Sequence, residues 1–160
     1  MADKAVAKLL AQKIQVKHSH RLNPLLFHGY TMDPMLQEGD QVIVEPLNWE
    51  DIQIGDIVTY CHLDCFPSRR VVKKHRNHLM LWCDNWHYKR FVVTPERILG
   101  RVVSRRRGGT VLHREDSEWD LLKEQALLIY RNTRFARFKH RIRESSRALI
   151  GKKEARRVDG

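Results

Sequence analysis

The sequence lacks any long hydrophobic run. In 160 residues, no apolar stretch approaches the roughly 20 residues that a membrane-spanning helix needs. The first 14 residues place three lysines among Ala and Leu, so they lack the apolar centre of a secretory signal peptide. These two absences predict a cytoplasmic protein.

Cysteine is also scarce. The three cysteines, Cys61, Cys65 and Cys83, form an odd set in a chain without a secretion signal, which favours reduced thiols over disulfides. The alternative is a zinc site completed by His62 or His87. However, Cys61 and Cys65 fall in an expected hairpin and no second paired motif accompanies them. We therefore expect neither a metal nor another cofactor.

Acidic residues are few, and their shortage is local. The formal net charge is +11. Residues 130–160 hold eleven Lys or Arg against three acids, whereas the first 129 residues contribute only +3. The basic character therefore belongs to the C-terminal tail. The 42% apolar content, with four Trp, predicts one folded core in the rest of the chain.

The middle of the chain consists of short apolar segments separated by turns. No long helical pattern interrupts them, and two Gly-Asp pairs, Gly39-Asp40 and Gly55-Asp56, mark turns. This spacing predicts an antiparallel, barrel-like or coiled β fold. The expected strands are residues 25–27, 41–44, 57–60, 69–75, 79–82, 91–93 and 98–103.

Helical patterns flank the expected sheet. Residues 2–14 have helical spacing, and so do Trp119, Leu122, Ala126 and Ile129 at i, i+3, i+7 and i+10. The Arg- and Gly-rich residues 105–109 are interpreted as a solvated linker. The chain is thus divided into a lead-in (1–24), a β domain (25–107) and a basic helical extension (108–160).

A second apolar stripe runs through the basic tail. An amphipathic helix of this kind is typical of a segment that lies on an anionic membrane surface or docks on a protein partner. Nucleic acid is the competing partner for the same charge, and we rank it lower. The residues expected to dock are Phe135, Phe138 and Ile142, with Arg134, Arg137 and Arg141.

Several short motifs follow one another between residues 25 and 104. Together they resemble the signal peptidase I and LexA-type serine peptidase superfamily, which implies its coiled β barrel. The motifs are Gly29-x-Thr31-Met32-x-Pro34-x-Leu36, Gly39-Asp40, Ile54-Gly55-Asp56-Ile57-Val58, Arg69-Arg70-Val71-Val72, Asp84-Asn85 and Ile98-Leu99-Gly100-Arg101-Val102.

The resemblance implies two catalytic positions, and this chain departs from the pattern at both. Thr31 stands where the superfamily has its nucleophilic Ser, and Arg69 stands where it has a Lys or His base. The β-methyl of Thr stiffens its side chain. The guanidinium of Arg stays protonated and cannot accept a proton, and losing a base removes about 100- to 10,000-fold of rate.

A substitute base is conceivable. Lys73 is expected on the same strand face as Arg69, but about 13 Å away unless a bulge shifts the register. Lys74 is expected on the opposite face. His62 or His75 could fold back toward Thr31.

We therefore interpret the domain as catalytically degenerate and as a peptide- or protein-binding module; the alternative is an active peptidase that uses Thr31 with a non-standard base. In the binding reading, Arg69 anchors a carboxylate or a carbonyl; in the structural reading, it only pairs with an acid such as Asp84. The positions implied to contact a bound peptide are Gly29, Tyr30, Met32, Pro34 and Asp84.

Overall fold

A single antiparallel sheet dominates the structure, a computed structural model that describes residues 24–63, 65–85 and 90–133. A helix follows the sheet at residues 117–133. The strands are β1 (Leu25–Leu26), β2 (Gln41–Glu45), β3 (Ile57–Tyr60), β4 (Ser68–Lys74), β5 (Leu79–Trp82), β6 (Arg90–Val93), β7 (Ile98–Arg107) and β8 (Thr110–His113), with the short 3-10 helix η1 (Pro95–Arg97) before β7.

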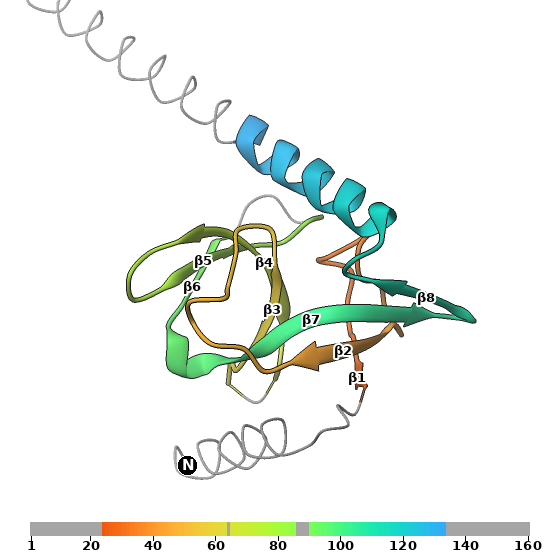
Figure 1. Ribbon diagram of the computed structural model, residues 1–160, viewed down its shortest axis with the longest axis horizontal. Coiled ribbons are helices and arrows are strands. Elements are labelled where there is room, and N and C mark those ends of the chain that lie inside the picture. Colours follow the sequence, from red (N-terminus) through yellow and green to blue (C-terminus); the bar gives the residue numbers. More distant parts are fainter. Residues whose placement is uncertain (1–23, 64, 86–89, 134–160) are drawn as a thin grey trace, which may run out of the picture. The chain divides into compact units, whose positions relative to one another are not determined.

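The long strand β7 organises the sheet. One of its edges pairs with β2, while its other edge pairs first with β3 and then with β8. The strand order is β1-β2-β7-β3-β4-β5-β6, and the sheet curls into a half-barrel (Figure 1). The prediction of a mainly antiparallel, barrel-like β fold is confirmed. Strands β1 and β6 end the sheet, so each has one edge without a described neighbour.

The two faces of the sheet bury different side chains. Because Ile57 pairs with Arg70 and Val58 pairs with Arg69, the two arginines project to opposite faces. Cluster 1 comprises Phe27, Met32, Met35, Leu36, Val42, Val44, Ile57, Val102, Leu112 and Trp119. Cluster 2 comprises Ile52, Val58, Tyr60, Val71, Leu79, Leu81 and Val93, with Trp49 and Phe91 packed against it.

The two Gly-Asp turns have the same construction, as the sequence predicted. Gly39 and Gly55 have φ values of 83° and 96°, which suit glycine. In each turn the Asp carboxylate accepts the N–H of the residue three positions earlier, at 2.8 Å. These hydrogen bonds fix the carboxylate of Asp40 just before β2 and the carboxylate of Asp56 just before β3.

The interpretation of residues 105–109 as a solvated linker is wrong. Strand β7 continues to Arg107, and Gly108 and Gly109 turn the chain into β8, which the sequence reasoning missed. The arginines are compatible with a strand because they find acids: Arg107 pairs with Asp40 and Arg105 with Glu118. Arg105 is only 6% exposed, and this burial lowers the pKa of its guanidinium.

The described helix confirms most of the expected stripe. Trp119 and Ala126 are buried and Leu122 packs against cluster 1, but Ile129 is 42% exposed. At about 100° per residue, Ile129 lies about 80° around the helix from Trp119. The chain forms two compact units, Met1–Leu127 and Leu128–Gly160. The expected helix at 2–14 and the tail from residue 134 lie outside the described residues.

Candidate functional site

The loop after β1 presents Tyr30 and Thr31 at the surface. Gly29 has a φ of 97°, and its N–H donates to Glu38, whose other oxygen lies 2.9 Å from His28 Nδ1. These hydrogen bonds lower the pKa of the Glu38 carboxyl. Met32 is fully buried in cluster 1, whereas Tyr30 is 72% exposed and Thr31 is half-buried. The loop is therefore anchored on either side of its exposed tip.

Asn85 holds the tip of this loop from the other side. Its backbone N–H donates to the carbonyl of Thr31 at 3.0 Å, and its Nδ2 donates to the carbonyl of Tyr30 at 3.2 Å. The expected nucleophile position and the Asp84-Asn85 motif, far apart in sequence, are thus brought together.

Arg70 and Asp84 form a buried pair beneath that contact. Arg70 is completely buried; its Nε donates to Asp84 at 2.7 Å, its Nη2 donates to the second carboxylate oxygen, and its Nη1 donates to the Gly55 carbonyl at 2.8 Å. The structural reading that paired Arg69 with Asp84 is wrong: Arg70 occupies both oxygens, because it is the arginine that faces cluster 1.

Arg69 has a different environment on the cluster 2 side. Its guanidinium carbon lies 5.4 Å from the centre of the Phe91 ring, and Nη1 donates to the Ser68 carbonyl at 2.7 Å. Its Nε is buried and has no hydrogen-bond partner in the described part of the chain. Burial raises the pKa of the neighbouring Tyr60, and the positive charge of Arg69 partly opposes that effect.

The expected orientations of Lys73 and Lys74 are wrong because β4 contains a bulge. Val71 pairs with Leu81 and Lys73 with Met80, so Val72 is an extra residue in the ladder. The shift places Lys74 on the face of Arg69 and Lys73 on the face of Arg70. Lys73 is exposed, and its role as a substitute base stays a prediction.

The remaining candidate bases are held by other contacts. The Nζ of Lys74 donates to three backbone carbonyls, those of Trp49 (2.7 Å), Glu50 (3.0 Å) and Ile52 (3.0 Å). Three donated hydrogen bonds are what a protonated ammonium makes. His75 stacks on His78 in the β4–β5 hairpin, and His62 contacts Arg97.

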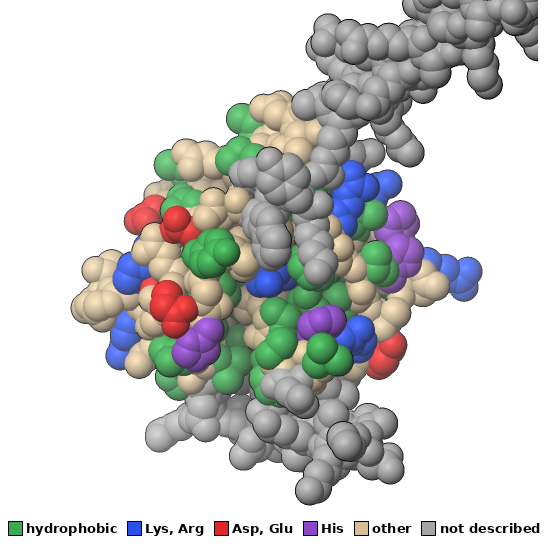
Figure 2. All heavy atoms as spheres, turned by 180° about the vertical axis from the view of Figure 1, so that it is seen from behind, with side chains coloured by type: hydrophobic (Ala, Val, Ile, Leu, Met, Phe, Trp, Pro, Cys, Tyr) green, Lys and Arg blue, Asp and Glu red, His purple; other side chains and the backbone are tan. Residues whose placement is uncertain are grey.

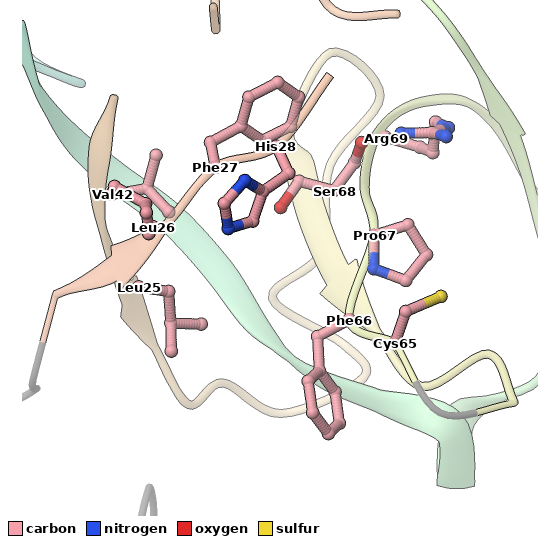
Figure 3. A pocket seen from close by; sticks show the side chains of 10 residues that line it. All are labelled: Leu25, Leu26, Phe27, His28, Val42, Cys65, Phe66, Pro67, Ser68 and Arg69. Carbon is pink, nitrogen blue, oxygen red and sulfur yellow. Dashed lines mark hydrogen bonds between the residues drawn. The ribbon is translucent and has the colours of Figure 1, made fainter. Parts of the chain in front are cut away.

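A groove of about 450 Å³ opens between β1 and residues 65–69. Figure 2 looks onto this face, where hydrophobic side chains border a hollow, and Figure 3 shows the side chains around it. One wall comes from Leu25, Leu26, Phe27 and His28, the other from Cys65, Phe66, Pro67, Ser68 and Arg69, with Val42 also lining it.

The groove is apolar for most of its length and has polar groups at defined points. Ser68 and Thr59 share a buried hydroxyl–hydroxyl hydrogen bond of 2.8 Å. Arg69 contributes the one arginine of the lining, and His28 is already paired with Glu38. Of the ten lining residues, only Arg69 was a predicted site residue. The other nine were not predicted as lining residues, because two segments 40 residues apart form the walls.

No group of three or more metal-binding side chains occurs among residues 24–63, 65–85 and 90–133. Cys61 and Cys83 are buried, Cys65 is exposed, and His87 lies outside these ranges. No helix in the same ranges is long and apolar enough to cross a membrane. The expected docking residues of the tail, from Arg134 to Ile142, also lie outside them, so their role stays a prediction.

The comparisons with known proteins give no assignment: neither any protein-family profile nor any curated protein matches the chain.

Proposed function

We propose that this chain is a catalytically degenerate member of the signal peptidase I and LexA-type superfamily, and that it binds an extended peptide in the groove beside β1. The antiparallel, curled sheet and the contact between the Thr31 loop and Asn85 support this placement. The motifs that carry the resemblance meet in space, although they are spread over most of the β domain.

The free edge of β1 next to the groove is the observation that carries the proposal. Phe27 directs both its N–H and its C=O toward residues 39–40. Because alternate residues of a strand point their backbone groups to opposite sides, Leu26 and His28 direct theirs away from β2. No described strand covers that edge. An extended peptide can pair with it and place alternate side chains in the apolar groove.

Binding without cleavage follows from the chemistry of the candidate catalytic groups. Arg69 is permanently protonated and cannot activate a hydroxyl, and Lys74 is engaged by three carbonyls. Thr31 keeps its hydroxyl but has no described base hydrogen-bonded to it. The groove therefore retains the means to hold a chain without the means to cut it.

The test is a binding measurement with fluorescent peptides of about eight residues, enough to span the groove when extended. Leu26→Lys puts a charge into the groove, while Val92→Lys is the matched control on the opposite edge strand. The two side chains are 54% and 60% exposed, so neither change disturbs the core. We expect Leu26→Lys to weaken binding about tenfold or more and Val92→Lys to leave it unchanged. Equal effects of the two variants would overturn the groove assignment.

Strand pairing itself is tested by methylating backbone nitrogens of the peptide. Methylation of alternate residues removes the N–H groups on one edge, so one of the two methylation patterns should abolish binding and the other should preserve it. Equal tolerance of both patterns would show that the peptide does not bind by strand addition.

Mass spectrometry of peptides incubated with the wild type and with Thr31→Ala distinguishes an active peptidase from a binding module. Intact peptides in both samples support the binding role. Cleavage that disappears in Thr31→Ala would establish the alternative, an endopeptidase with an unusual base.

The tail has its own test, independent of the groove. We infer from its stripe of Phe and Arg that it docks on an anionic membrane or a protein partner. Liposome flotation measures membrane binding of the full chain and of a chain that ends at residue 130. Loss of liposome binding in the shorter chain supports the membrane role, and equal partitioning excludes it.

A further inference from the structure

The wall of the groove that β4 provides has a defined end, and this end bears on which ligand the groove can hold. From Arg70 onward, β4 has a strand on both sides: Arg70 pairs with Ile57 of β3 and with Trp82 of β5. A chain lying along residues 65–69 cannot continue past this point as an added strand, because β5 occupies the position. A strand added along this edge of β4 therefore ends at Arg69.

Arg69 stands at this end of the free β4 edge with unused donors. Nη1 is bonded to the Ser68 carbonyl, but Nε is buried without a partner among the described residues. No described carboxylate lies within ion-pair distance of its guanidinium. By contrast, five other arginines of the described part pair with Asp or Glu, namely Arg70, Arg101, Arg105, Arg107 and Arg114.

A half-buried cation that has no counter-ion among the described residues favours a ligand that brings an anion. The guanidinium of Arg69 lies over the Phe91 ring, so its fork is already oriented. None of the ten lining residues is an acid. Glu38, which follows in the adjoining loop, is already occupied by His28 and the Gly29 N–H. Apart from His28 and Cys65, the rest of the lining is apolar or carries the hydroxyl of Ser68. The complementary group is a planar carboxylate, which a guanidinium binds through two parallel hydrogen bonds.

We propose that the groove recognises the end of a chain: a peptide whose free C-terminal carboxylate pairs with Arg69 while its last residues add a strand to β1. This inference rests on the proposed peptide-binding function and narrows its ligand. A terminal carboxylate fits better than a side-chain carboxylate because a chain lying along residues 65–69 as an added strand ends at Arg69, where β5 takes the next position.

The test compares two peptides with the same apolar sequence, one ending in a free acid and one in an amide. With the full-length wild-type chain we expect the acid to bind about tenfold tighter or more, the size of a hydrogen-bonded charge pair. Tight binding of both peptides with equal affinity would overturn carboxylate recognition and leave the groove assignment standing. Failure of both peptides to bind would overturn the proposed function as well.

The variant Arg69→Gln tests whether Arg69 is the residue that binds the carboxylate. Arg76→Gln, in the exposed β4–β5 hairpin, is the control. We expect the preference for the acid to vanish in Arg69→Gln and to persist in Arg76→Gln. A preference that persists in folded Arg69→Gln would exclude Arg69 as the anchor. The acid–amide comparison on wild type does not depend on how well the variant folds.

A third peptide distinguishes the source of the carboxylate. It ends in an amide and carries an Asp as its last residue, so its only acid is a side chain. We expect it to bind like the plain amide peptide. Binding equal to that of the free acid would show that Arg69 reads a side-chain carboxylate, which would overturn the C-terminal assignment.

Discussion

Arg69 and Arg70 are neighbours in β4, but the two faces of the sheet treat their charges differently. Arg70 is completely buried, and its donors reach the carboxylate of Asp84 and the carbonyl of Gly55. Arg69 is half-buried, lies on an aromatic ring and donates to one carbonyl of its own strand. Both are arginines in the same short motif, so sequence position alone does not separate their roles.

This difference separates a charge that stabilises the fold from a charge that is available to a ligand. A buried ion stabilises a structure only when its partners are complete, since an unpaired buried charge is strongly unfavourable. Arg70 meets that condition and links the Gly55 turn to the segment that holds the Thr31 loop. Arg69, without a described counter-ion at the end of a groove, does not contribute to the fold in that way.

The largest effect is expected from Arg70→Ala. Removing the cation leaves Asp84 buried without a partner, which costs about 3–5 kcal/mol of unfolding free energy. Urea denaturation measures the loss, with the exposed Arg76→Ala as the matched control. Replacing both members, as in Arg70→Met with Asp84→Leu, should restore a large part of the stability. A loss below about 1 kcal/mol in the single variant would contradict the structural role of the pair.

Asp40→Asn is expected to have the next largest effect. Burial raises the pKa of Asp40, but hydrogen bonds from Arg107 and the Gln37 N–H outweigh it, so the folded pKa lies below the unfolded value. The stabilisation is therefore complete above the unfolded pKa of about 4 and is lost as the pH falls through the folded pKa.

Denaturation at several pH values checks this prediction. At pH 7 we expect Asp40→Asn to cost about 1–3 kcal/mol, because Arg107 and a buried N–H lose a charged acceptor. The gap from wild type should narrow as the medium becomes acidic. The exposed Asp51→Asn is the control. A gap that stays constant down to acid pH would show that the charge of Asp40 does not carry the stability.

The sequence was sufficient to predict most of the sheet but only Arg69 among the residues that line the groove. Short apolar segments separated by turns identified the strands β2 to β7. The Arg-Arg-Val-Val run gave no sign of the bulge at Val72, since either register buries a valine. One extra residue then exchanged the faces of Lys73 and Lys74.

The groove was beyond prediction for a different reason. Its walls come from residues 25–28 and 65–69, which only the pairing of β1 with β2 and of β3 with β4 brings together. Leu26 and Phe66 are ordinary apolar residues in short segments. Arg69 stood out because it replaced an expected base, but the lack of a counter-ion among the described residues is a property of the folded surroundings.

Lys73 and Lys74, which follow the bulge, also lie on opposite faces of β4, and we expect their substitutions to have smaller effects on stability. Lys74 joins the carbonyls of Trp49, Glu50 and Ile52, and lies 5.6 Å from the centre of the Trp49 ring. We expect Lys74→Met to cost about 1–2 kcal/mol in urea denaturation. The same change at exposed Lys73 should stay within about 0.5 kcal/mol. If the two costs were reversed, the register on either side of Val72 would be wrong.

The smallest effect on stability is expected from Arg69→Gln, next to the residue that gives the largest. The change removes a contact with the Phe91 ring worth about 0.5–1 kcal/mol, but it also removes a half-buried charge that has no described counter-ion. These contributions oppose each other, so the urea midpoint should move little. A loss as large as that of Arg70→Ala would mean that Arg69 is also a structural ion. A nearly unchanged midpoint, together with loss of the preference for a free carboxylate, would separate ligand recognition from folding within two adjacent residues.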